Sequence, residues 1–202
     1  MSKGKLLMHS IYLVRHGKAE LGGDEAERPL TPEGFVHAKQ VSQILFSLTP
    51  RIAALYSSPF RRAKSTLEPL AGMSGLPVNI VDALREKHMS DEPIPDLAAA
   101  RRQMWADFTY RLPGGETNAE AQERATKALK KLEKAHPMEA VAVASHGTLI
   151  GLILNSYDPG FGYDEWREMT MPDIYRIDVK PSGKGRIEHV GCAEIETFRV
   201  RG

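Results

Sequence analysis

Two histidines and two arginines in this sequence come just after apolar segments that read as buried strands. Arg15 and His16 directly follow one such segment, His146 follows a second, and Arg62 lies close behind a third. Ligands of open α/β sheets bind outside the carboxyl ends of the strands, so we expect these side chains to share one crevice. Cations gathered there would repel one another unless an anion bound among them. Phosphate suits the arginine fork, and the backbone N–H of Gly17 would add a donor.

The chemistry that such a site favours is transfer of a phosphoryl group. Neutral imidazole is nucleophilic, and its ordinary pKa of about 6.5 leaves a useful neutral fraction near pH 7, so His16 could attack phosphorus. Enzymes accelerate phosphomonoester hydrolysis by up to ~10²¹, or roughly 28 kcal/mol of barrier. A phosphohistidine intermediate, surrounded by fixed positive charge, would divide this barrier into two smaller steps.

The elements that must position these residues alternate along the chain. Strands are predicted at 11–14, 53–57, 77–82 and 139–145, and helices at 31–45, 58–71, 117–135 and 147–155. The second helix is predicted to open at Ser58, and Thr117 with Glu120 forms a capping box for the third. Segments 173–179 and 186–190 then predict an antiparallel hairpin. We therefore expect an α/β fold: a three-layer helix/sheet/helix sandwich with a mostly parallel central sheet and an antiparallel edge near the C-terminus.

Length and composition limit the class of protein. The 202 residues predict a single domain, and a formal net charge of +1 gives no general attraction to nucleic acid or to an anionic membrane. The longest apolar run is interrupted by polar residues and is too short to span a bilayer. A single cysteine, Cys192, is compatible with a reducing compartment and predicts an inert thiol. We expect a cytoplasmic protein without nucleic-acid or membrane partners.

Six sequence motifs, in the same order, resemble those of the histidine phosphatase superfamily. They read LVRHGKAE, LTPEG, SSPFRRAKST, LRE, PGGET and VASHGTLI, and they are spread in this order along most of the chain. That superfamily contains cofactor-dependent phosphoglycerate mutases, fructose-2,6-bisphosphatases, α-ribazole phosphatases and protein phosphohistidine phosphatases. The resemblance implies an α/β enzyme, and for this chain we expect no cofactor.

The resemblance also implies a role for each residue that matches a motif. His16 would be the phosphorylated nucleophile and Arg15 would bind the phosphate beside it. The family's second arginine precedes an alanine, which selects Arg62 over Arg61. His146 would hold the phosphoryl oxygens. Glu86, in LRE, falls where many members keep the acid that protonates the leaving group and then activates water.

Two departures from the family pattern concern the substrate. The first motif continues without the asparagine that mutases and many small-molecule phosphatases place on the phosphate, which favours a phosphatase over a mutase. An insert at about 87–116 is expected to form a cap, with a helix from about Pro95 to Phe108. In one interpretation its aromatic residues and arginines face a substrate. In the other, the aromatic residues pack on the core and the arginines are solvated. Lys18 either contacts a second acidic group of the substrate or is solvated.

The sequence leaves several functions open. The leading hypothesis is a metal-independent phosphatase acting on a small phosphorylated metabolite. The alternatives are a mutase-type phosphotransferase, a protein phosphohistidine phosphatase and a non-catalytic module that binds phosphoanions. A metal site made of His16, His146, Glu86 and His88 is disfavoured by the two flanking arginines. The oligomeric state stays open, with a homodimer through the C-terminal hairpin as one option.

Overall fold

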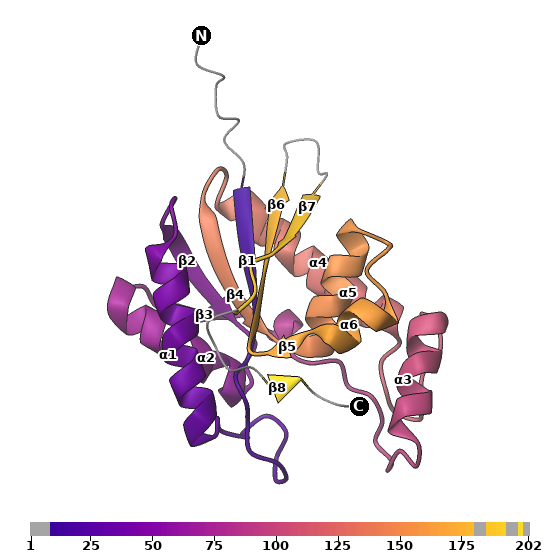
Figure 1. The fold of residues 1–202 in the computed structure, drawn as a ribbon. Helices are drawn as coiled ribbons and strands as arrows, with labels where there is room; N and C mark the ends of the chain where they lie inside the picture. Colours follow the sequence, from indigo (N-terminus) through magenta and orange to yellow (C-terminus); the bar gives the residue numbers. More distant parts are fainter. Residues whose placement is uncertain (1–8, 180–184, 193–197, 200–202) are drawn as a thin grey trace.

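One six-stranded sheet forms the centre of the molecule (Figure 1). The structure is a computed structural model that describes residues 9–179, 185–192 and 198–199. The strand order is β3-β2-β4-β1-β6-β7. The bounds are β1 His9–Arg15, β2 Ile52–Ser57, β3 Val78–Ile80, β4 Ala140–Ser145, β6 Asp173–Val179 and β7 Gly185–His189. The first four run parallel to one another and β6 and β7 add an antiparallel edge, which confirms the predicted sheet.

Helices cover both faces of this sheet. In Figure 1, α1 (Pro32–Ser47) and α2 (Arg61–Ser74) lie on one side, and α4 (Asn118–Ala135) and α5 (Gly147–Tyr157) lie on the other. Each pair packs on a separate buried apolar cluster, because the side chains of a strand alternate between the two faces. The predicted three-layer α/β sandwich is therefore confirmed.

Local capping signals place most helix starts correctly. Thr31 accepts a hydrogen bond from the N–H of Gly34 at the start of α1, and Thr117 and Glu120 form the predicted capping box of α4. The predicted start of α2 at Ser58 is wrong, because α2 begins at Arg61. The hydroxyl of Ser58 instead lies against a histidine of the candidate site.

Smaller elements complete the fold. They are the 3₁₀ helix Asp82–Leu84, α3 (Leu97–Ala106), α6 (Tyr163–Glu168) and the two-stranded pair β5 (Thr170–Met171) and β8 (Phe198–Arg199). Of these, α3 matches the helix expected in the insert, whereas α6 was not expected. Most of the predicted hairpin turn, residues 180–184, lies outside the described residues. Within the described part of the chain, no helix is long and apolar enough to cross a membrane.

Candidate active site

The pairing of two central strands brings the two histidines together. Strands β1 and β4 run parallel in a register that pairs Arg15 with Ser145, so His16 and His146 follow at equivalent strand ends. The N–H of His16 donates to the carbonyl of Ser145 at 3.1 Å. The two imidazole rings meet edge to face, with centroids 5.2 Å apart. A local sequence feature, one histidine after each strand, thus becomes a pair through sheet register.

Hydrogen bonds define which nitrogen of His16 is nucleophilic. Nδ1 lies 2.7 Å from the carbonyl oxygen of Gly17, which can only accept, so Nδ1 carries the proton. The guanidinium of Arg62 donates through Nε to the other nitrogen, Nε2, at 3.1 Å. Both contacts select the same tautomer. The lone pair of His16 is therefore on Nε2, on the side of the arginine.

The surroundings keep both histidines neutral. Burial lowers the pKa of His16 well below its ordinary 6.5, and the charge of Arg62 lowers it further. Burial likewise lowers the pKa of His146 well below 6.5, with smaller contributions from His16 and Arg62. Low local dielectric disfavours the charged imidazolium in each case. At neutral pH His16 is consequently a neutral imidazole with a free lone pair on Nε2, which is the form that can attack phosphorus.

His146 is held by a hydroxyl and keeps one nitrogen without a partner. Its Nε2 lies 2.7 Å from Oγ of Ser58, while its buried Nδ1 has no hydrogen-bond partner among the described residues. Buried polar nitrogens are nearly always paired in folded proteins. Nδ1 is therefore a candidate contact for a phosphoryl oxygen beside His16.

Arg62 is fully buried beside His16, whereas Arg61 is exposed. The guanidinium of Arg62 donates to both the backbone carbonyl and the carboxylate of Glu25, at 2.6 and 2.7 Å. The same carboxylate accepts from Arg28. Glu25 thus provides the anionic partner of Arg62 in this structure. A phosphate would have to share or replace that partner.

Arg15 is fixed by contacts with the backbone near Gly147 and β5. Its Nη1 donates to the carbonyls of Met169 and Thr170, and its buried Nε has no partner among the described residues. Gly147 lets the guanidinium approach, because a Cβ at that position would lie 2.9 Å from Cζ of Arg15. The glycine of the second histidine motif is thus explained by packing against the arginine of the first.

Gly17 and Lys18, which were expected near the bound anion, both have partners within the protein. The N–H of Gly17 donates to Oγ1 of Thr66, so this structure does not offer it to an anion. A Cβ on Gly17 would lie 2.8 Å from the carbonyl oxygen of Gly34, so close packing explains the glycine here as well. Lys18 lines the site and forms an ion pair with Glu33 at 2.8 Å.

Glu86 lies at the amino end of α5. Its carboxylate accepts hydrogen bonds from the backbone N–H groups of Lys87, Thr148 and Leu149, at 2.8 to 3.2 Å. The exposed amide dipoles of a helix N-terminus favour a negative group there. The 3₁₀ helix before Glu86 and the start of α5 therefore together fix this carboxyl beside Gly147.

An arginine behind Glu86 holds the surrounding loop. Arg124, on α4, donates to the carbonyls of Ala83, Arg85 and Glu86 at 2.7 to 3.3 Å. Its guanidinium is also paired with the carboxylate of Glu116, from the motif PGGET. Burial alone would raise the pKa of Glu116, but the hydrogen bonds and charge of Arg124 hold it below its ordinary value. The half-buried ion pair of Arg124 and Glu116 thus positions the backbone of Glu86.

These groups surround a cavity of about 900 Å³ at the carboxyl ends of the parallel strands. It is lined by Arg15, His16, Lys18, Arg62 and Glu86 from the predicted site. Two predicted residues, Gly17 and His146, lie next to the cavity without lining it; His146 is fully buried behind His16. Of the remaining histidines, His88 is exposed at the cavity rim and contacts Asp91.

The sequence did not identify several residues of the site. They are Glu25, Arg28, Ser58, Arg85, Glu116 and Arg124. Ser58 and Glu116 lie inside motifs that were recognised, so their motif membership was a usable signal. Arg124 lies on the polar side of an amphipathic helix, where nothing in the local pattern distinguishes it from a solvated arginine.

Some residues of the insert pack on the core and one faces the cavity, so each of the two predictions for the insert holds for part of it. Met104 is buried, and Trp105 and Phe108 pack against the core, as the packing alternative predicted. Arg102 is exposed, but Arg101 lines the cavity. The aromatic residues therefore support the fold, while one arginine of α3 faces the candidate site.

Fold and site together define an α/β protein whose two histidines and two arginines gather at the ends of adjacent parallel strands. The family model that describes the histidine phosphatase superfamily (branch 1) matches residues 11–190. The chain belongs to this superfamily. The resemblance noted in the six motifs is confirmed.

Relatives of the chain include both mutases and phosphatases by name. A protein called "Probable phosphoglycerate mutase GpmB" from Salmonella choleraesuis is 28% identical over 193 residues, covering 87% of each chain. Mycobacterial glucosyl-3-phosphoglycerate phosphatase superposes with a TM-score of 0.76 at 19% identity, covering 90% of this chain and 98% of that one. The α-ribazole phosphatase of Shigella flexneri gives 0.68 at 18%, covering 89% and 95%. At these identities the solved structures support the fold alone.

Proposed function

We propose that this protein is a metal-independent phosphomonoester phosphatase that works through phosphorylated His16, on a small phosphorylated metabolite. The observation that carries the proposal is the state of His16. It is neutral, its Nε2 lone pair faces Arg62, and it lines a cavity large enough for a small ester. The two arginines supply the fixed positive charge that a phosphoryl group needs during transfer.

The first half-reaction forms the phosphoenzyme. Nε2 of His16 attacks phosphorus, the P–O bond to the alcohol breaks, and Glu86 gives its proton to the departing oxygen. Arg15 and Arg62 bind the equatorial oxygens, and His146, whose ring packs edge to face on His16 and whose Nδ1 has no partner among the described residues, would add a contact if the pair opens toward the phosphoryl group. To bind phosphate, the guanidinium of Arg62 must loosen its contacts with Nε2 and with the carboxylate of Glu25.

The second half-reaction releases inorganic phosphate. Glu86, now ionised, takes a proton from water while the water oxygen attacks phosphorus. The P–N bond breaks, and its electrons return to His16 as the neutral lone pair. Glu86 ends protonated, ready for the next ester. One carboxyl thus serves as acid and then as base.

Hydrolysis of para-nitrophenyl phosphate in EDTA tests the proposal, from pH 5 to 8, with wild type, His16→Ala and Glu86→Gln. We expect wild-type turnover that resists EDTA and disappears in His16→Ala. Glu86→Gln should lose more activity with an alkyl phosphate than with the nitrophenyl ester, because nitrophenolate leaves without a proton. Turnover that persists in folded His16→Ala would contradict the phosphohistidine route.

A mutase-type phosphotransfer is the second candidate, and the names of the 28% identical relatives favour it. It would need the same phosphorylated His16, with the phosphate returned to an alcohol instead of water. Release of inorganic phosphate, followed together with isomerisation of a phosphorylated hydroxy acid, separates the two reactions. Isomerisation that exceeds phosphate release would favour the mutase.

A further inference from the structure

A fully buried carboxylate, that of Asp173, lies at the start of β6 beside the candidate site. Its side chain is 0% exposed. Strands β1 and β6 pair in a register that places Asp173 directly opposite Arg15. Side chains opposite one another across an antiparallel pair project from the same face of the sheet. Asp173 is therefore a close neighbour of Arg15, although among the described residues its ion pair is with His189.

Three hydrogen bonds hold this carboxylate in one orientation. Oδ1 accepts from the backbone N–H of Ile174 at 2.9 Å and from Nε2 of His189 at 2.7 Å. Oδ2 accepts from the backbone N–H of Thr170 at 2.9 Å. Burying a carboxylate is costly unless such donors surround it. An asparagine would not replace it, because its NH2 group would face at least one of these N–H donors.

The hydrogen bond to Thr170 orients a peptide group that also binds Arg15. The N–H of Thr170 and the carbonyl of Met169 belong to the same planar trans peptide, so they point in opposite directions. The carboxylate of Asp173 accepts from this N–H at 2.9 Å. Nη1 of Arg15 donates to this carbonyl, also at 2.9 Å. Asp173 and Arg15 thus hold the two sides of a single peptide group.

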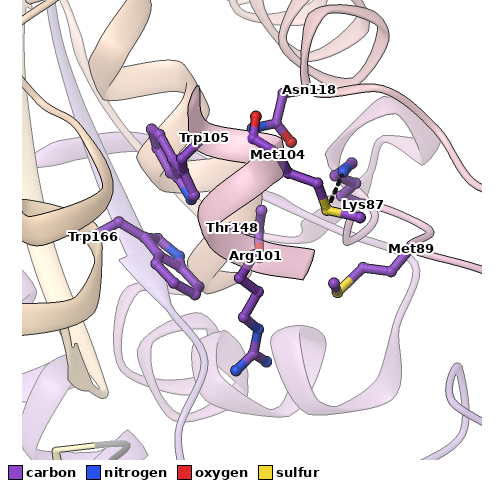
Figure 2. A pocket seen from close by; sticks show the side chains of 8 residues that line it. All are labelled: Lys87, Met89, Arg101, Met104, Trp105, Asn118, Thr148 and Trp166. Carbon is purple, nitrogen blue, oxygen red and sulfur yellow. Dashed lines mark hydrogen bonds between the residues drawn. The ribbon is translucent and has the colours of Figure 1, made fainter. Parts of the chain in front are cut away.

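The chain before this peptide is anchored separately. Met169 follows α6, and Trp166 of α6 packs beside Trp105 of α3 with ring centroids 6.0 Å apart (Figure 2). A Cβ on Gly151 would lie 2.9 Å from the ring of Trp166, so α6 also packs closely on α5. The packing of Trp166 thus fixes the chain as far as Met169. The orientation of the next peptide is set by its hydrogen bond to Asp173.

The charge of Asp173 also acts on Arg15. Burial lowers the pKa of Arg15, and the charges of Glu86 and Asp173 oppose this effect. Hydrogen-bonded groups polarise one another in a low dielectric, so a carboxylate on the N–H side makes the carbonyl of Met169 a stronger acceptor. Because Nη1 of Arg15 is engaged by carbonyls, the rest of the guanidinium is left for an anion. Its buried Nε has no partner among the described residues.

We propose that Asp173 is a positioning residue for Arg15: through the peptide between Met169 and Thr170, it holds the guanidinium in the orientation that binds the phosphoryl group of the substrate. The inference rests on the proposed function, in which Arg15 binds equatorial oxygens. It adds to that function a residue that does not touch the substrate, since Asp173 lies outside the lining of the cavity.

Replacing Asp173 with asparagine tests this role by calorimetric titration with inorganic phosphate. The substitution keeps the size of the side chain but places an NH2 group against Thr170 or against the donors on Oδ1. We expect Asp173→Asn to weaken phosphate binding about tenfold or more, the loss of about one charge-assisted hydrogen bond from Arg15. An unchanged Kd in the folded variant would mean a purely structural role. Tighter binding would mean that Asp173 acts only as a negative charge, and either result would overturn the proposal.

A double-mutant cycle shows whether the effect passes through Arg15. Arg15→Met alone should weaken phosphate binding at least as much as Asp173→Asn does. Asp173→Asn added to Arg15→Met should then change Kd by less than about twofold, because no guanidinium is left to orient. A further tenfold loss on that background would contradict the positioning role.

Asp178→Asn is the matched control. Asp178 is also buried and lies on the same strand, near the end of β6 that is remote from β5. It accepts a hydrogen bond from Ser10 and forms an ion pair with Arg176 at 3.0 Å. Its substitution should lower Tm without changing the Kd for phosphate. An equal loss of phosphate affinity in both variants would indicate general loosening of the fold and contradict the proposal.

Failure of this inference can be told apart from failure of the proposed function. Phosphate binding as tight in Arg15→Met as in wild type would refute the role of Arg15 in that function. Weaker binding in Arg15→Met, with no change in Asp173→Asn, would refute only the positioning role. A wild type that binds phosphate but cleaves no ester would refute hydrolysis, and the same Kd values would still decide the role of Asp173.

A second variant covers the case in which Asp173→Asn does not fold. Asp173→Ser removes the carboxylate without placing an NH2 group against the backbone N–H donors. It should weaken phosphate binding in the same direction, and an unchanged Kd would again refute the positioning role.

Discussion

Replacing Arg124 with methionine tests whether this arginine positions the catalytic acid. The change keeps a long apolar side chain but deletes the donors to the carbonyls of Ala83, Arg85 and Glu86 and to the carboxylate of Glu116. Glu116 would keep a longer contact with Arg85, at 3.3 Å. The segment that carries Glu86 would then lose these hydrogen bonds to α4.

The stability effect follows from the burial of this pair. Side-chain exposure is 15% for Arg124 and 19% for Glu116. The pair is only partly buried and Glu116 keeps its contact with Arg85, so the loss should be about 1–3 kcal/mol, the cost of leaving a partly buried polar group without its partner. For a chain of this size that corresponds to a loss of about 2–12 °C in Tm. Arg111→Met is the matched control, because Arg111 and Glu120 form an exposed pair that should contribute less than about 1 kcal/mol.

The catalytic effect separates positioning from general loosening of the fold. A misplaced Glu86 should lower kcat about 10- to 100-fold for glycerol 3-phosphate, whose alkoxide needs a proton, since a general acid contributes about 10²–10⁴-fold. For para-nitrophenyl phosphate the loss should stay below about threefold. Both rates are measured well below the Tm of the variant. Equal losses for the two esters at full folding would refute a role of Arg124 in positioning the acid.

Two further predictions concern the histidine pair and Arg15. Because burial lowers the pKa of His16 and His146, the unfolded chain binds more protons, so stability should fall as pH drops below about 6.5, by up to about 1.4 kcal/mol per pH unit for each histidine. Denaturant titrations from pH 7.5 to 5.5 should give a flatter profile for His146→Gln than for wild type; parallel profiles would contradict the assignment. Gly147→Ala should push the guanidinium of Arg15 from its place and raise KM for para-nitrophenyl phosphate about tenfold, with little change in Tm. An unchanged KM would show that Arg15 adjusts without cost.

The layers of the fold were predictable because local signals agree with the tertiary structure. The fully buried strand β4 reads as an uninterrupted apolar run, since it lies between β1 and β2 and is covered on both faces. Helix starts followed from Thr31 and from the Thr117 capping box. The start of α2 was mispredicted because Ser58 has two available roles, helix cap or partner of a histidine. Only the approach of β4 selects the second.

The sequence by itself determined which chemical groups stand at the strand ends and which family they belong to. Arg15, His16, Arg62, His146 and Glu86 were all named from motif and spacing, and the structure brings them together around one cavity or directly behind it. Their grouping was predictable because the carboxyl ends of parallel strands lie at one edge of the sheet.

Only the tertiary structure decided which of these groups have partners. The N–H of Gly17 is taken by Thr66, 49 residues away, while the ammonium of Lys87 is buried and donates to the sulfur of Met104. Burial and pairing arise from contacts between distant segments, which no local pattern encodes. The same long-range packing lowers the pKa of His16, and so the state of the candidate nucleophile follows from the fold rather than from its motif.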